Sequence, residues 1–178
     1  MTVINDPSGT FAGVTPDNHF MVESISKSDF EYQSLINKRG FAILSRVVGA
    51  AANDYVMTIE CLSENLGFVI NQIKVGGSAS LEFEYGFVTD GTLAGTAVDP
   101  VNCNTAGTSG PLAAKGDGAV TGIVSVDAIG QSGTAGANTY ETVETESGII
   151  LTKGEKLYVK TLDAADINVT VFGHFRSV

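Results

Sequence analysis

Residues 80–88, "SLEFEYGFV", alternate between apolar and polar side chains more regularly than any other part of this chain. Leu81, Phe83, Tyr85 and Phe87 occupy every second position, and Glu82, Glu84 and Gly86 lie between them. Successive side chains of a β-strand point to opposite faces, so the segment predicts a strand with one dry face and one wet face. Such strands are typical of antiparallel sheets.

Other segments repeat this pattern, and short turn-like stretches separate them. In residues 55–61, Tyr55, Met57, Ile59 and Cys61 are expected to share one face, and in residues 67–75 the same is expected of Val69, Ile73 and Val75. Residues 148–175 contain three further strand candidates, one of which places Ile167, Val169 and Val171 on one face. The sequence therefore predicts an all-β fold, an antiparallel β-sandwich.

The chain divides into an N-terminal arm and one domain. Residues 1–20 are rich in Pro, Gly, Asp and Thr, with the isolated apolar residues Val3, Ile4, Phe11 and Val14, and we expect an extended arm that docks along a neighbour. Residues 21–178 form the single sandwich, and residues 23–39 fit a short helix or an extended segment. About residues 88–147 we expect a long Gly-rich insertion that shapes an interaction surface.

Composition favours an oligomer and argues against nucleic-acid or membrane binding. The 178 residues are 43% hydrophobic but only 17% charged, so we expect other subunits to cover part of the surface. A formal charge of −10 opposes contact with phosphate backbones or anionic bilayers. With no signal peptide or membrane span in the sequence, we expect synthesis in a cytoplasm and a soluble product.

Residues with catalytic potential are scattered. Cys61 and Cys103 have no second cysteine or histidine at metal-ligand spacing. The sequence does not decide between a disulfide joining them and two free thiols, although it favours free thiols. His19 and His174 are far apart in sequence, and His174 fits a packed strand residue. Glu82 and Glu84 could serve a hydrolase but better fit a solvent face. We therefore predict no enzyme and no catalytic, cofactor-binding or metal-binding residues.

The stretch "DPVNCN", residues 99–104, predicts a stiff structural corner. Pro100 fixes its own φ, and the side chains of Asn102 and Asn104 can bond nearby backbone groups in Asx-turns. These three residues, together with Val3, Ile4, Phe11 and Val14, are our candidate interface residues.

The second half of the chain resembles a group of tailed-bacteriophage virion proteins. The matching residues are Gly95, Thr96, Val98, Pro100, Val101, Asn102 and Asn104, followed by a Gly/Ala tract and a late hairpin with Ile150, Leu151, Gly154, Tyr158 and Val159. The resemblance implies a jelly-roll-like sandwich that assembles as a homotrimer and decorates or cements a capsid, or belongs to a fibre or tail attachment.

The leading hypothesis is a non-enzymatic phage virion protein, a homotrimeric capsid decoration or cement protein whose partner is the major capsid protein or another virion protein. It would be assembled in the host cytoplasm and reside in the virion. The alternative is a receptor- or glycan-binding module of a phage fibre or tail, with residues 88–147 as its recognition surface.

Overall fold

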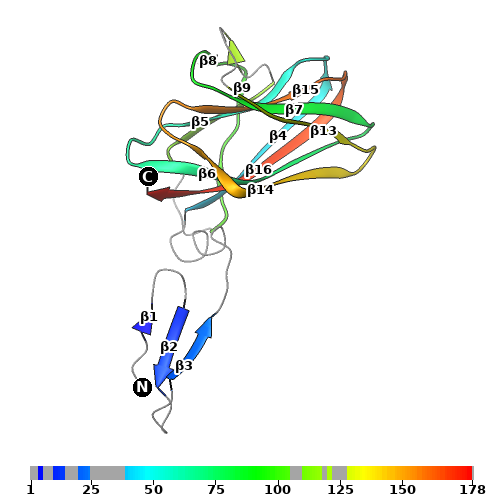
Figure 1. Ribbon diagram of the computed structural model, residues 1–178. Coiled ribbons are helices and arrows are strands. Elements are labelled where there is room, and N and C mark those ends of the chain that lie inside the picture. The colour runs from blue at the N-terminus through cyan, green and yellow to red at the C-terminus, as the bar shows by residue number, and fades with distance from the viewer. Residues whose placement is uncertain are drawn as a thin grey trace.

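The structure is a computed structural model that describes residues 4–5, 10–14, 20–24, 39–104, 110–117, 120–121 and 128–177. Two antiparallel sheets pack face to face (Figure 1). The five-stranded sheet has the order β10 (Val101–Asn102), β4 (Gly40–Ala50), β16 (Ala165–Ser177), β6 (Leu66–Gly77) and β14 (Tyr140–Leu151). The six-stranded sheet has the order β13 (Ala128–Ala135), β7 (Leu81–Val88), β15 (Lys156–Thr161), β5 (Tyr55–Cys61), β11 (Leu112–Gly116) and β9 (Thr96–Ala97).

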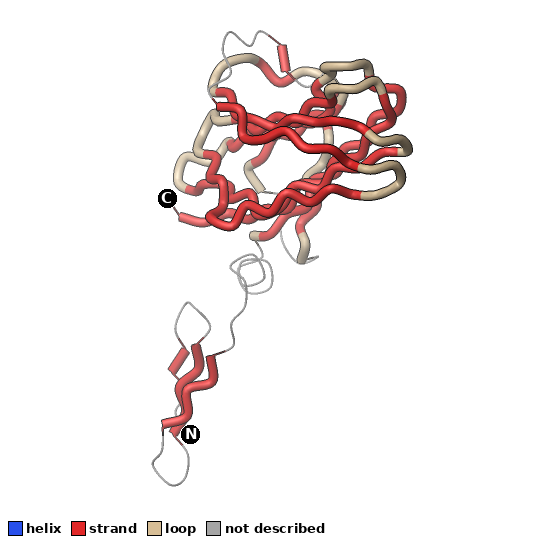
Figure 2. Tube along the Cα trace, turned by 45° about the vertical axis from the view of Figure 1, so that its right-hand side comes forward, coloured by secondary structure: helices blue, strands red, loops and turns tan. Residues whose placement is uncertain are grey.

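Strands that follow one another along the chain alternate between the sheets. β4 and β6 belong to the five-stranded sheet, whereas β5 and β7 belong to the six-stranded sheet. The alternation resumes with β13 in the six-stranded sheet and continues through β14, β15 and β16. Figure 2 shows the two layers of strands, and no helix occurs among the described residues. The prediction of an antiparallel all-β sandwich is confirmed.

The core lies between the layers and follows the predicted alternation. Leu81, Phe83 and Tyr85 of β7 are buried, as are Ile167, Val169 and Val171 of β16. Burial of one such side chain contributes about 1.5–3 kcal/mol. Nearer one end of the core, the Phe175 ring packs at 5.2 Å from Phe68 and 5.7 Å from Phe41, measured between centroids. Gly173 makes room there, since an added Cβ would lie 2.5 Å from Cζ of Phe68.

Two β-bulges overturn details of the predicted faces. Between β5 and β15 the register shifts after Met57↔Val159, so that Tyr55 pairs with Lys160 and packs against Tyr158 on the outer face, whereas Met57 stays inside. Between β6 and β16 a second shift at Asn71 puts Val69 outside the core cluster. An extra residue in one strand reverses the faces beyond it, so strict alternation predicts such positions wrongly.

The predicted insertion contributes to the framework. Residues 88–147 contain β11 and β13, both members of the six-stranded sheet, and the start of β14. They also contain β8 (Thr92–Leu93) and β12 (Val120–Thr121), which pair with each other. The described part of the segment therefore contains strands and is not an irregular loop. The sequence did not predict these strands, because period-two alternation is weak where Gly, Ala and Thr occupy both faces.

The N-terminal region contains three short strands, β1 (Ile4–Asn5), β2 (Thr10–Val14) and β3 (Phe20–Ser24). They pair in this order into a separate antiparallel sheet. The described part of the predicted arm is therefore paired backbone rather than a single extended strand. The short helix considered for residues 23–39 falls largely outside the described residues. Over the described part of the chain, no helix is long and apolar enough to cross a membrane.

Candidate functional site

The corner at residues 99–104 has the local geometry that the sequence predicts. The backbone N–H of Asn104 donates to Oδ1 of Asn102 at 2.8 Å, which is an Asx-turn. The N–H of Cys103 donates to the carbonyl oxygen of Gly40 at 2.9 Å, and β10 pairs with the start of β4. Pro100 directly precedes β10. The corner thus fixes a two-residue strand against the edge of the five-stranded sheet.

This corner places Val101 on an apolar outer surface. Val101 pairs with Ala42, and residues paired across a ladder share a face. Leu44 and Val48 of β4 lie on the same outer face, since they alternate with buried Ile43 and Val47. Leu44, Val48 and Val101, here called the outer stripe, are 60%, 68% and 64% exposed. Arg46 lies between Leu44 and Val48 and is exposed as well.

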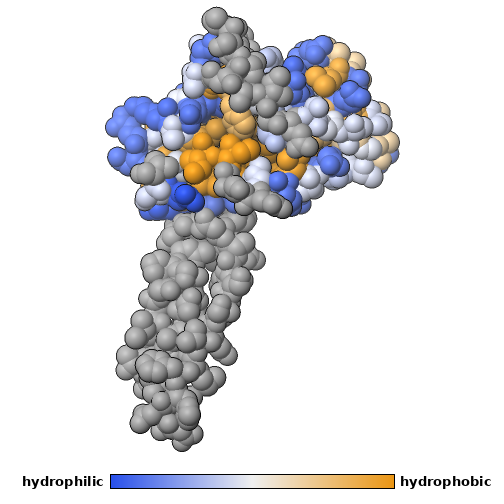
Figure 3. All heavy atoms as spheres, viewed as in Figure 1, coloured by the Kyte–Doolittle hydropathy of each residue, from blue (hydrophilic) through white to orange (hydrophobic). Residues whose placement is uncertain are grey.

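A second apolar surface lies on the flank between the sheets. Figure 3 shows an apolar area in the region of β14. The residues that line a groove of about 270 Å³ there are Phe87, Val88, Thr89, Ile149, Ile150, Leu151 and Glu155. Phe87 and Ile149 pack against the core cluster, whereas Ile150 lines the groove without belonging to that cluster. We call this surface the flank groove.

The outer stripe and the flank groove lie at opposite edges of one sheet. β10 and β4 form one edge of the five-stranded sheet, and β14 forms the other. The outer stripe is exposed, whereas the groove side chains Phe87, Ile149 and Ile150 are partly buried, so the groove is an apolar recess rather than an exposed patch. The geometry provides two different apolar surfaces for contacts between proteins.

The outer face of the six-stranded sheet carries a charged cluster that is satisfied internally. Oε1 of Glu84 accepts a hydrogen bond from the Tyr158 hydroxyl at 2.9 Å and lies 3.2 Å from Nζ of Lys160. The Tyr55 ring packs edge-on against Tyr158 at 5.3 Å. Burial, and then the hydrogen bond and negative charge of Glu84, raise the pKa of Tyr158 well above its ordinary value.

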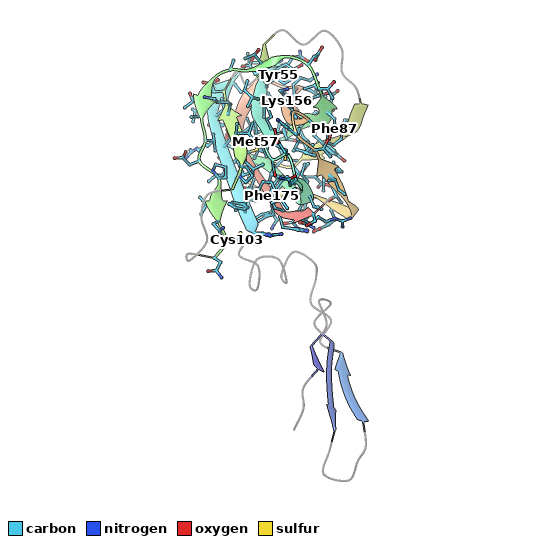
Figure 4. All side chains as sticks on the ribbon, turned by 90° about the vertical axis from the view of Figure 1, so that its left-hand side faces the viewer. Tyr55, Met57, Phe87, Cys103, Lys156 and Phe175 are labelled. Carbon is cyan, nitrogen blue, oxygen red and sulfur yellow. The ribbon has the colours of Figure 1, made fainter. Side chains whose placement is uncertain are left out.

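This arrangement gives Glu84 a structural role. An ion pair and a hydrogen bond hold its carboxylate, and Glu82, two residues away, is exposed. Figure 4 shows Tyr55 and Lys156 toward the outer side of this sheet, whereas Met57 and Phe175 lie between the sheets. Lys156 is itself buried and donates to the carbonyl oxygens of Gly154 and Thr89. Neither glutamate lies in the groove described above.

The cysteines and His174 also have structural surroundings. Cys61 is buried and Cys103 is exposed, and both are free. His174 is fully buried, with Nδ1 2.8 Å from Oδ1 of Asn71 at the β6 bulge, and so belongs to the packed sheet as predicted. Among the described residues, no group of three or more His, Cys, Asp or Glu side chains could hold a metal ion.

The structure describes the backbone of three of the four candidate residues of the arm. The backbone of Ile4 belongs to β1 and that of Phe11 and Val14 to β2, whereas Val3 lies outside the described residues. Their proposed interface role remains a prediction.

Comparison with known proteins adds no relative: neither a protein-family model, nor a curated protein, nor a solved structure matches this chain.

Sequence reasoning missed the outer stripe, although "FAILSRVV" carried a signal for it. Alternation in that segment gives Phe41, Ile43 and Val47 to one face, and Leu44 and Val48 to the other. Apolar residues on both faces of an edge strand indicate a surface that another molecule covers.

Proposed function

We propose that this protein is a non-enzymatic structural protein of a tailed-bacteriophage virion, a homotrimer that binds and stabilises the capsid surface as a decoration or cement protein. The fold we propose within this class is a jelly roll. The alternation of β4–β7 and β13–β16 between two sheets supports it, because strands of a jelly roll also alternate between two sheets. The resemblance of the Gly95–Asn104 region to phage virion proteins supplies the biological context.

The observation that carries the proposal is the pair of apolar surfaces at opposite edges of the five-stranded sheet. A twofold dimer buries the same patch of both subunits, whereas a ring of three uses two different patches of each subunit. The outer stripe of one copy and the flank groove of the next provide two such patches. Three identical head-to-tail contacts would then close the ring and cover the exposed apolar side chains.

The net negative charge of the chain supports a position on the outside of a particle. A protein with a formal charge of −10 is repelled by packaged nucleic acid, so the outer shell suits it better than the interior. The N-terminal residues 1–20, with the candidate contacts Val3, Ile4, Phe11 and Val14, would reach onto the capsid lattice or a neighbouring subunit. Under this proposal the protein acts by burying complementary surface rather than by catalysis.

Co-sedimentation with phage capsid shells that lack accessory proteins tests this proposal. The full chain is expected to pellet with the shells and to saturate them at a fixed ratio. A variant without residues 1–20 is expected to stay in the supernatant while retaining the β-sheet circular dichroism of the full chain. A full chain that never pellets with shells would contradict the proposal, and a truncated variant that saturates them equally would contradict the role of the arm.

A further inference from the structure

A small polar pocket lies at one end of the sandwich, apart from both apolar surfaces. Its volume is about 270 Å³, and the residues that line it are Gly77, Ser78, Asn138, Thr139, Tyr140 and Asn168. They come from the last residue of β6 and the residue after it, the connection between β13 and β14, the first residue of β14, and β16. None of these residues lines the flank groove or belongs to the outer stripe.

Tyr140 contributes an aromatic ring to the lining of this pocket. Tyr140 pairs with Gly76, and an added Cβ on Gly76 would lie 2.8 Å from Cδ1 of the Tyr140 ring. The ring therefore rests on glycine backbone where no larger residue fits. Tyr140 nevertheless remains 60% exposed, so much of the ring is open to solvent.

Hydrogen bonds to backbone carbonyl oxygens fix the pocket residues beside this ring. Asn138 has a φ of 56°, and its N–H donates to the carbonyl oxygen of Gly77 at 2.9 Å. Oγ1 of Thr139 donates to the carbonyl oxygen of Gly136 at 2.9 Å. A pocket held in this way needs little ordering when a ligand binds, which lowers the entropic cost of binding.

The rim offers neutral hydrogen-bonding groups. The side chains of Ser78, Asn138 and Asn168 make no hydrogen bond with other described residues, and each can both donate and accept. All six lining residues are uncharged at neutral pH. The pocket therefore favours a ligand that has one apolar face and many hydroxyl or amide groups at its edge, and that carries no net charge.

We propose that this pocket binds a neutral saccharide. A pyranose ring presents axial C–H groups on one face, which pack on an aromatic ring, and hydroxyl groups around its edge, which match the amides of Asn138 and Asn168. The volume accommodates about one sugar residue, so recognition would be of a single terminal or internal unit of a glycan. This inference does not depend on the virion proposal, since a decoration protein and an unrelated sandwich could both carry it.

The test is a titration of the ¹⁵N-labelled full chain followed by two-dimensional NMR. The probes are maltose, lactose, mannobiose and diacetylchitobiose, with N-acetylneuraminic acid as the charged comparison. We expect at least one neutral disaccharide to give saturable shifts at Gly77, Asn138 and Asn168, with a dissociation constant on the order of 1 mM. No saturable shift with any of the four at about 50 mM, or tighter binding of the charged sugar, would overturn the proposal.

Variants then locate the site. Tyr140→Ala is expected to weaken binding at least tenfold, whereas Tyr140→Phe, which keeps the ring, is expected to retain most of it. Leu62→Ala is the matched control, because Leu62 is also an exposed apolar residue, at 47%, and lies outside both the pocket and the outer stripe. Should Tyr140→Ala disturb folding, Asn168→Ala removes a rim amide and is expected to weaken binding as well. Unchanged binding in both Tyr140→Ala and Asn168→Ala would refute the assignment.

Discussion

Replacing the outer stripe by serine, in the triple variant Leu44→Ser/Val48→Ser/Val101→Ser, is expected to dissociate the oligomer without unfolding the sandwich. The three side chains are 60%, 68% and 64% exposed, so they contribute little to the fold of one subunit. Full burial of a Leu or Val side chain contributes about 1.5–3 kcal/mol. Covering the exposed fraction should therefore contribute about 1–2 kcal/mol per residue.

The three residues together account for about 3–6 kcal/mol at each contact between subunits. A change of 1.4 kcal/mol corresponds to a factor of ten, so the dissociation constant should rise by roughly two to four orders of magnitude. Sedimentation velocity over a range of protein concentrations measures this change. Leu62→Ser is the matched control, because Leu62 is 47% exposed but lies outside the stripe and is expected to leave association unchanged.

A mixing experiment tests whether the two surfaces meet head to tail. Ile150→Ser alters the flank groove without removing a residue of the core cluster. The stripe variant and the groove variant should each be monomeric alone, but an equal mixture should form dimers, because one intact stripe then meets one intact groove. A stripe variant that sediments like the wild type at every concentration would refute the reasoning, and a mixture that stays monomeric would refute the pairing of the two surfaces.

Three further predictions concern single side chains. Tyr158→Phe removes the hydrogen bond to Glu84 and should lower the free energy of unfolding by about 1–2 kcal/mol at neutral pH, measured in urea. The pKa of Tyr158 in the folded protein lies above its unfolded value of about 10. The stabilisation is therefore complete below that pH and is lost as the pH rises through the folded pKa. Above pH ~10 the stability of the variant should fall less with pH than that of the wild type. Thr58→Val should stabilise the fold by about 1 kcal/mol in thermal unfolding, because the buried Oγ1 has no hydrogen-bond partner. Cys103 should react with a thiol reagent in the folded protein, but more slowly at pH 8 than a free cysteine does, because partial loss of hydration raises the pKa of its thiol.

Each of these has an internal control. Tyr55→Phe leaves the bond to Glu84 in place and removes only the smallest of the contributions that raise the pKa of Tyr158, so it should keep most of the pH dependence of the wild type. Thr92→Val changes an exposed threonine of β8, outside the two main sheets, and tests whether added hydrophobicity alone stabilises the chain. Cys61 is buried and should react only after unfolding. Equal labelling rates for the two cysteines would contradict the burial of Cys61. A destabilised Thr58→Val variant would contradict the unpartnered hydroxyl. An unaltered pH profile in Tyr158→Phe would contradict the hydrogen bond to Glu84.

The sequence predicted the fold class because alternation is a property of the strand itself. Residues 81–85 and 167–172 keep strict register in the sandwich, so their buried faces follow directly from spacing. The Asx-turn at Asn102 was predictable for a similar reason, since it depends only on residues two apart. Local patterns of this kind need no knowledge of the partner strand.

The features that the sequence did not predict depend on contacts between distant segments. The bulge that turns Tyr55 outward is visible only when β5 is paired with β15, and the bulge at Asn71 only when β6 is paired with β16. The saccharide pocket likewise joins residues 77–78, 138–140 and 168, which no spacing rule connects. The flank groove brings Phe87 to Ile149 and Ile150 through the packing of two sheets.

Light scattering of the purified full chain, coupled to size exclusion, measures the central claim most directly, because the proposal requires a closed ring of three identical chains. A head-to-tail trimer should have a molar mass three times the 18.5 kDa of one chain, constant across the eluted peak. A mass of one chain at all concentrations, or of two chains, would contradict the head-to-tail trimer.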